Sequence, residues 1–328
     1  MTFNYKNVYL NETSTVCGPV EKEGPLKNYF DKSYDDMYFG EKSFEKAEVK
    51  LVKDSINILL KKSGLNREDI NLVVGGDLLN QITASTYGTY GVGDSYIGIY
   101  SACSTSVLGM IVASNFIEGK FIDNAIVEVS SHNSGAEKQY RNPVEYGAPK
   151  QDSNTFTSTG GAACLLSNEE SNIRVDCATL GKIVNYEQND VNDMGRVMAP
   201  AVYETLISHF TETGRNPDYY DLILTGDLGI YGKEIITDYM KEAGYILDNY
   251  NDCGVMLYDL DKQKEVHAGG SGPVCSALVN FSYIYNRLKK KKLKKVLLVA
   301  TGALFSPTTI HQGDDIYSIA HAISLEVV

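Results

Sequence analysis

The sequence has 328 residues, enough for one large or two medium domains, and its formal net charge of -12 argues against nucleic acid as the main partner. No run approaches the roughly 18–20 apolar residues of a membrane-spanning helix, and the N-terminal stretch is too polar for a signal peptide. We therefore expect a protein that is made and kept inside the cell. The six Cys include no C-x-x-C pair, so they predict neither a disulfide framework nor a metal site; Cys164 and Cys177 are expected in the core.

In chain order, the first predicted unit is a helix that ends near Gly64. An Asn-led turn and a buried strand ending in Gly-Asp-Leu follow within "NREDINLVVGGDLLNQ" (66–81). The apolar stretch "YIGIYSACSTSVLGMIVAS" (96–114) then predicts a strand that runs into a helix over about 104–117. Cys103 lies in the turn between them. A thiol at a helix start faces free backbone N–H groups, which favours the thiolate.

The strand "AIVEVSSH" (125–132) ends in His132 and is followed by a predicted loop of about 29 residues, which makes 132–161 the pocket loop. Loops of this length inside a compact domain are usually functional. This one carries Lys138, Arg141 and Lys150 in a chain that is otherwise acidic. Each of the three could equally be a solvated loop charge. As a group they are the best candidates for positively charged residues that would contact a ligand in the predicted pocket.

The second half repeats the pattern of the first. A helix ending near Gly214 precedes "NPDYYDLILTGDLGIYG" (216–232), which matches 66–81 at a spacing of about 150 residues. The Gly-rich turn "GGSGP" (269–273), a helix and the strand "VLLVATGA" follow. Two α/β halves, 1–172 and 173–328, each with a parallel sheet, would form one five-layer αβαβα body. A pseudo-twofold axis would bring Cys103 close to residues 269–273.

These features resemble the thiolase superfamily. The "ACST" turn of this sequence is similar to the nucleophile turn of ketoacyl synthases, which belong to that superfamily. Longer segments resemble the stage V sporulation protein AD family of spore-forming bacteria, among them "GGDLLNQ", "SACSTS", "SSHNSGAEKQYRNPVEYGAPK", "DMGRVMAPA", "LILTGDL" and "AGGSG". The resemblance covers nearly the whole chain. It implies a thiolase-like fold and a non-enzymatic role without a cofactor. That role is to bind dipicolinic acid (pyridine-2,6-dicarboxylate) and to help load it into the forespore alongside membrane-protein partners.

A condensing enzyme of this superfamily needs a base and hydrogen-bond donors beside its thiolate. By the resemblance, Asp227, Ser271 and Thr301 stand where His, Asn and Cys would be needed, and a carboxylate repels a thiolate. We therefore expect no catalytic residue, and we interpret His267 as a strand residue before the Gly-rich turn. Two alternatives stay open. One is an acyltransferase or condensing enzyme with Cys103 as its nucleophile, and the other is a structural subunit that docks on a membrane complex and binds no small molecule.

A planar dicarboxylate would need local positive and hydrogen-bonding groups in so acidic a chain. A helix start offers backbone N–H groups, Arg offers a bidentate contact, and neutral side chains offer further donors. The resemblance leaves open whether the ligand is the free acid or its calcium chelate. The candidate ligand-binding residues are Asn80, Gln81, Cys103, Ser104, Thr105, His132, Lys138, Arg141, Asp227 and Ser271.

Two surface features bear on partners. The run "KKKKLKK" (289–295) is typical of a solvated helix end, and it could also lie on an anionic membrane surface. The resemblance places the protein at the periphery of the forespore or spore inner membrane. By analogy with the superfamily, the strand "SYIGIYS" (95–101) predicts a homodimer in which it pairs with its mate.

Overall fold

The computed structural model describes residues 1–328, and its two halves build five strands each in the same spatial order. In the first half the order is β5 (Ser95–Gly98), β4 (Leu72–Gly76), β6 (Asn124–Ser131), β8 (Gly160–Ser167) and β2 (Tyr9–Cys17). In the second half it is β11 (Tyr250–Asp252), β10 (Leu222–Thr225), β13 (Lys295–Leu304), β14 (Tyr317–Val327) and β9 (Ile173–Thr179). The shared order confirms the predicted duplication.

The sheets are mixed, whereas the sequence predicted parallel ones. In each half the first two neighbouring pairs are parallel and the next two are antiparallel. A single pairing between Tyr9 and Arg174 joins the halves into one sheet. Short strands extend it: β1 (Thr2–Asn4) pairs with β9, and β3 (Lys32–Ser33) pairs with β2.

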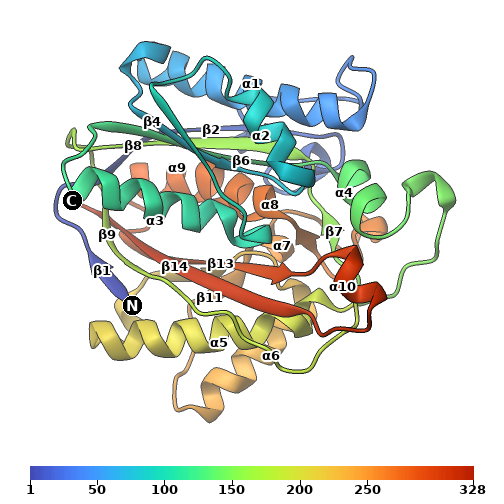
Figure 1. Cartoon of the computed structure of the whole chain (residues 1–328). Coiled ribbons are helices and arrows are strands. Elements are labelled where there is room, and N and C mark those ends of the chain that lie inside the picture. Colours follow the sequence, from blue (N-terminus) through green and yellow to red (C-terminus); the bar gives the residue numbers. More distant parts are fainter.

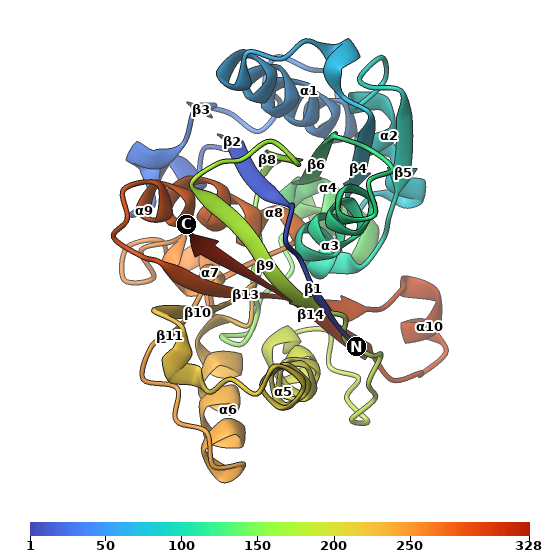
Figure 2. The ribbon, with the colours of Figure 1, turned by 90° about the vertical axis from the view of Figure 1, so that its left-hand side faces the viewer.

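Helices cover the two halves of the sheet in the five layers that the repeat predicted (Figure 1). The outer layers hold α1 (Phe44–Ser63) with α2 (Thr83–Gly88), and α5 (Met194–Thr213) with α6 (Gly229–Glu242). The central layer holds α3 (Thr105–Glu118), α8 (Pro273–Leu278) and α9 (Tyr285–Lys289). Figure 2 shows this central layer end-on, between the two halves of the sheet. Helix α3 contacts β6 of one half and β13 of the other.

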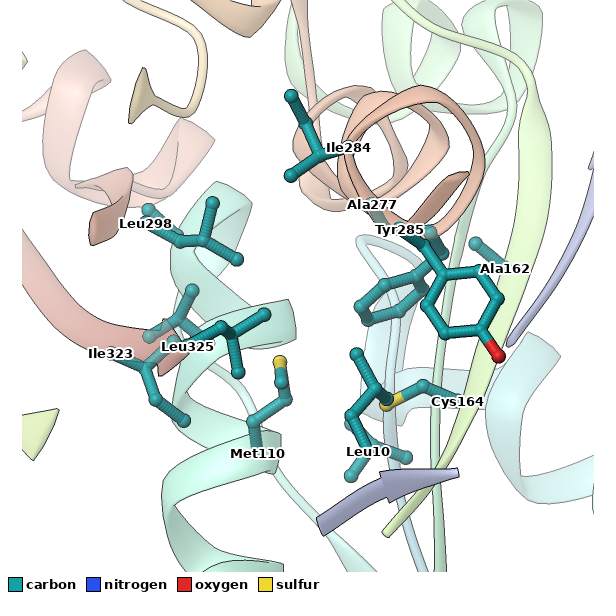
Figure 3. Close-up of a cluster of buried hydrophobic side chains, with 14 of the residues drawn as sticks. Leu10, Met110, Ala162, Cys164, Ala277, Ile284, Tyr285, Leu298, Ile323 and Leu325 are labelled. Atoms are coloured by element: carbon teal, nitrogen blue, oxygen red, sulfur yellow. The ribbon is translucent and has the colours of Figure 1, made fainter. Parts of the chain in front are cut away.

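The largest core cluster surrounds this central layer. Met110 of α3 lies between Leu10 and Cys164 on one side and Ile323 and Leu325 on the other (Figure 3). A helix that packs on two sheets needs apolar residues around most of its circumference, which the sequence of α3 provides. All six cysteines are free thiols, and every one except Cys103 is buried.

The repeat extends to the chain's local geometry. Helices α1 and α5 end at Gly64 (φ 74°) and Gly214 (φ 67°), in the left-handed conformation that glycine adopts without strain. An Asn-led 3-10 turn follows each glycine, and β4 or β10 follows each turn. Asp77 and Asp227 therefore occupy matching places just after these two strands, at the carboxyl edge of the sheet.

The structure changes two of the predicted segments. The strand expected at 95–101 is limited to β5, an edge strand with mostly exposed side chains, because only β4 pairs with it. Its pairing with a second copy stays a prediction. The predicted pocket loop begins with a helix, α4 (Asn133–Tyr140), and contains the strand β7 (Phe156–Thr157), which pairs with β12 (Gly270–Ser271) of the Gly-rich turn.

Two short helices complete the fold, α7 (Cys253–Met256) and α10 (Pro307–His311). Helices α4 and α10 lie at the same end of the molecule (Figure 1). None of the helices has both the length and the apolar character needed to cross a membrane.

Candidate functional site

Cys103 lies in a 3-10 turn, Ala102–Ser104, between β5 and α3. Ala102 has a φ of 47°, a conformation that residues other than glycine rarely adopt. Local hydrogen bonds hold the turn: Ser104 Oγ donates to the carbonyl of Ser101, and Thr105 Oγ1 donates to that of Ala102, both over 2.7 Å. The residues on either side of Cys103 are buried, while Cys103 itself is half-buried.

The Gly-rich turn of the second half faces this thiol. Cys103 Sγ lies 3.9 Å from Ser271 Oγ. This contact confirms that the pseudo-twofold arrangement brings residues 103 and 269–273 together. Gly272 has a φ of 96°, and a Cβ at this position would approach Ser131 Oγ to 2.9 Å, so the turn requires a glycine there.

Asp227 organises the floor of the site. Its Oδ2 accepts hydrogen bonds from Ser271 Oγ and from the N–H of Gly272, each over 3.1 Å, and its Oδ1 accepts one from Thr301 Oγ1. Asp227 is buried, and burial raises its pKa to about 7, with the charge of Asp252 adding to the effect. Asp227, Ser271 and Thr301, which the resemblance places where His, Asn and Cys would be needed, thus form one hydrogen-bonded network. Within this network the backbone N–H of Gly272 already donates a hydrogen bond to Asp227.

The thiol is disfavoured as an anion. Burial, followed by the negative charge of Asp227, raises the pKa of Cys103 well above its ordinary value. The prediction that the helix start favours a thiolate is therefore wrong. One histidine, His321, contacts Ser101 Oγ in the turn over 3.3 Å, and burial lowers its pKa to about 4.

The helix start does not offer the predicted anion site. The N–H of Ser104 donates to the carbonyl of Ser101 over 3.0 Å, and the N–H of Thr105 donates to that of Ala102. Ser104 and Thr105 are fully buried, and neither lines the pocket. Because the turn closes on itself with 3-10 hydrogen bonds, these two donors are already used.

The thiol opens onto a narrow pocket, here called the Cys103 pocket. About 40 Å³ of it is open to the centre of a water molecule, which is room for a few waters. Ten of its 13 lining residues are hydrophobic. The lining consists of Leu78, Tyr100, Ala102, Cys103, Ala136, Tyr140, Arg141, Thr157, Met194, Met198, Ser271, Ala303 and Phe305.

Arg141 is the cation that reaches this pocket. It ends α4, where its Nη1 donates to Glu137 Oε1 over 3.0 Å and its Nη2 donates to the carbonyl of Val191 over 3.2 Å. Its Nε is buried and has no partner. Lys150 Nζ lies 3.4 Å from the same Glu137 oxygen, so a buried carboxylate holds both cations.

Two further predicted ligand residues, at the start of α4 and within it, do not line the pocket. His132 is fully buried between Phe39 and Phe44, donates from Nε2 to the carbonyl of Met37 over 2.7 Å, and caps α4 through Nδ1. Burial lowers its pKa to about 4. Lys138 is exposed and pairs with Glu45 over 2.7 Å.

Asn80 and Gln81 line a neighbouring groove that shares Tyr100, Tyr140 and Phe305 with the Cys103 pocket. Of the ten candidates, the structure therefore places Cys103, Arg141 and Ser271 in the pocket lining, with Asp227 beneath them.

Sequence reasoning missed the apolar walls of the pocket. The Tyr100 and Tyr140 hydroxyls are 3.3 Å apart, and the rings of Tyr140 and Phe305 lie 5.4 Å apart. Met194 and Met198 come from one face of α5, and their spacing of four was visible in "DMGRVM". No comparable signal pointed to Tyr100, Tyr140 and Phe305, because they come from three segments that only the fold brings together.

Comparisons with known proteins agree with this architecture. The OleA protein of Xanthomonas campestris, bound with cerulenin, superposes with a TM-score of 0.63 at 15% identity, over 99% of this chain and 98% of that one. The 3-oxoacyl-[acyl-carrier-protein] synthase III of Aquifex aeolicus superposes with a TM-score of 0.58 at 10% identity, over 97% and 99% of the two chains. At such low identity these likenesses establish the thiolase-like fold alone.

Sequence comparison is more specific. The stage V sporulation protein AD of Bacillus subtilis (strain 168) is 43% identical over 320 residues, which span 97% of this chain and 94% of that protein. The family model described as stage V sporulation protein AD matches residues 1–326. With residues 1–326 matched and its two halves folded as in thiolase-like enzymes, the chain belongs to the stage V sporulation protein AD family.

Proposed function

We propose that this sporulation protein is a non-catalytic binding protein for dipicolinate, which it holds in the Cys103 pocket. The observation that carries the proposal is the pairing of two features at one pocket. Ser271 Oγ, Thr301 Oγ1 and the N–H of Gly272 already donate hydrogen bonds to Asp227, and the charge of Asp227 disfavours the thiolate. Arg141 lines the same pocket, and its buried Nε has no hydrogen-bond partner. The first feature removes the means of condensation, and the second supports carboxylate binding.

The walls of the pocket suit a planar ring. Tyr100, Tyr140 and Phe305 supply aromatic surface, and Met194 and Met198 supply adaptable thioether side chains. The pocket has room for a few waters, and we expect the side chains of its walls to rearrange when the ring enters, as is common on ligand binding. Tyr100 is 46% exposed, so it can swing outward without disturbing the core.

The alternative function is acyl transfer through Cys103, and it has a direct test. When the purified protein is incubated with acetyl- or malonyl-coenzyme A at pH 7.5, we expect its intact mass to stay unchanged. The reason is that the protonated thiol has no histidine base in its pocket. The Cys103→Ala variant, treated in the same way, is the control. One acyl group per chain on the wild type and none on the variant would establish the enzyme and overturn the proposal.

We further propose that the protein works at an anionic membrane surface, beside membrane-protein subunits, and that it accepts the free acid or its calcium chelate. The run from Lys289 to Lys295 supports the membrane surface. Lys289 pairs with Glu12 over 3.5 Å, and Lys295 lies over the ring of Tyr219. Lys290, Lys291 and Lys292 are exposed and form no ion pair. Each such lysine contributes about 1 kcal/mol at an anionic membrane.

Cosedimentation with vesicles tests this surface. We expect the protein to bind vesicles that contain phosphatidylglycerol at low salt and to be released at high salt. Changing Lys290, Lys291 and Lys292 together to Glu should weaken binding about ten-fold or more.

The control for this experiment is Lys46→Glu, Lys53→Glu and Lys61→Glu on the exposed face of α1, which changes the net charge equally. Equal loss in both triple variants would mean that net charge alone governs the interaction, and retention of binding by the Lys290–292 variant would exclude this surface.

A further inference from the structure

A second cavity, here called the Arg141 groove, also has Arg141 in its lining. It is formed by α4, the segment 142–150, β7 and the residues just before the Gly-rich turn, at the end of the molecule where α4 projects (Figure 1). About 380 Å³ of it is open to the centre of a water molecule, against about 40 Å³ in the Cys103 pocket. Only three of its 15 lining residues are hydrophobic. It therefore has both the room and the polarity that the Cys103 pocket lacks.

The groove is rich in hydrogen-bond donors. Arg141, Lys150 and His267 line it, together with the amide side chains of Asn133, Asn142, Asn154 and Asn192. Its acidic residues are Glu137 and Glu265. Glu137 forms ion pairs with both Arg141 and Lys150, and its negative charge therefore holds the two cations in place. Lys150 has one Nζ contact with a carboxylate and keeps donors for a ligand.

Arg141 lines both cavities. Two of its three nitrogens donate to Glu137 and Val191, and the third, Nε, is buried without a partner. Buried donors without partners are rare in folded proteins, and a bound acceptor is one explanation for them. A ligand with one group in each cavity would therefore contact Arg141 from both.

We propose that the Arg141 groove is the subsite for the second carboxylate of the ligand, and that Lys150 and His267 select dicarboxylates over monocarboxylates. This inference rests on the proposed function. One carboxylate and the ring edge occupy the Cys103 pocket beside Arg141. The other carboxylate extends into the groove, where the Lys150 ammonium and the His267 imidazole donate to it. His267, which we interpreted from the sequence as a strand residue, instead follows the 3-10 turn Lys264–Val266 with a φ of 56° and makes only an isolated bridge to Thr155. In this proposal it has a role in recognition.

Calorimetric titration with two ligands tests the subsite. Dipicolinate carries two carboxylates, and picolinate (pyridine-2-carboxylate) carries one on the same ring. We expect Lys150→Ala to weaken dipicolinate binding about five- to ten-fold, because it removes a charge-assisted contact that is partly exposed to solvent. The same variant should change picolinate binding less than about two-fold. His267→Ala should act in the same direction.

The matched control is Lys138→Ala, which removes an equal charge from the same helical region but from a side chain outside the groove. It should change the affinity for neither acid. If the wild type binds dipicolinate but Lys150→Ala and His267→Ala bind it as tightly, the groove proposal fails while the proposed function stands. An equal loss for both acids would also contradict it, because Lys150 would then act through Arg141. If the wild type binds neither acid, the proposed function itself fails.

Discussion

Replacing Arg141 by alanine is expected to weaken dipicolinate binding by about ten-fold or more. Arg141 is the only cation in the lining of the Cys103 pocket, and the helix start offers no free N–H at Ser104 or Thr105 to replace it. A hydrogen bond to a charged group contributes about 1.5–3 kcal/mol, and 1.4 kcal/mol corresponds to about ten-fold in affinity. Titration calorimetry of wild type and variant measures the ratio.

Arg141→Lys separates charge from geometry. It keeps the positive charge but loses the planar fork, so we expect an affinity between those of the wild type and Arg141→Ala. Thermal unfolding of each variant checks that the loss of the Glu137 ion pair has not unfolded α4. Wild-type affinity in a folded Arg141→Ala protein would show that the ligand does not use this residue.

Substitutions of Cys103 complete the series. Cys103→Ala should weaken binding only modestly, because a thiol contributes packing and a poor hydrogen bond. Cys103→Trp should abolish binding, because the indole would fill a pocket with room for only a few waters. If Cys103→Ala instead abolished binding while Arg141→Ala had no effect, the roles assigned to these two residues would be wrong.

The second large effect concerns pH: the protein should lose folding stability as the pH rises from about 6.5 to about 8. Five buried carboxyl groups have pKa values raised mainly by burial, namely Asp77 and Asp252 to about 6, Glu21 and Asp227 to about 7, and Glu128 to about 8. Burial also raises the pKa of Glu48. In the unfolded chain such groups titrate near pH 4, at about 3.9 for Asp and 4.3 for Glu.

The direction of this change in folding stability with pH follows from proton binding. Above about pH 4 the folded protein holds more protons on these carboxyls than the unfolded chain, so their contribution to stability falls as the pH rises through the folded-state pKa values. The buried His132, His209 and His321 have pKa values lowered to about 4, so they oppose this trend only below their unfolded pKa of about 6.5. Above about pH 6.5 the carboxyls dominate. Between about pH 6.5 and pH 8, the titration of Glu128 alone lowers the free energy of unfolding by on the order of 1–2 kcal/mol.

Urea unfolding at several pH values measures this trend. The midpoint should fall between about pH 6.5 and pH 8, and Glu128→Gln should flatten the fall, since the amide does not titrate. In the structure, Glu128 accepts a hydrogen bond from Ser85 Oγ and is influenced by the charge of Asp77. A midpoint that stays level or rises over this range would contradict the proton balance described here.

The fold was largely predictable because duplication leaves a strong signal. The pair "LVVGGDLL" and "LILTGDLG" marks equivalent strands, and Gly64 and Gly214 mark equivalent helix ends. The all-round apolar character of residues 105–118 indicates a central helix. Helix α4 was missed because its sequence, "NSGAEKQY", has little apolar periodicity, and its N-terminus is capped by His132, an unusual capping residue.

The site was predictable only where it depends on the repeat. The meeting of Cys103 with Ser271, and the placement of Asp227 beside them, follow from matching strand ends in the two halves. The positions of His132 and Lys138 depend on how α4 turns: one side chain packs inward against Phe39 and Phe44, and the other pairs with Glu45 at the surface. Neither direction can be read from residues expected to form a loop. The aromatic wall likewise requires the folded chain.

The most direct test of the central claim is calorimetric titration of dipicolinate into the wild-type protein and into Cys103→Trp, with and without Ca²⁺. A non-catalytic binding protein that uses the Cys103 pocket should give saturable heat with one site per chain in the wild type and no heat in the variant. Comparing the two calcium conditions shows whether the free acid or its chelate is preferred. Absence of binding to the wild type, or undiminished binding to Cys103→Trp, would contradict the account.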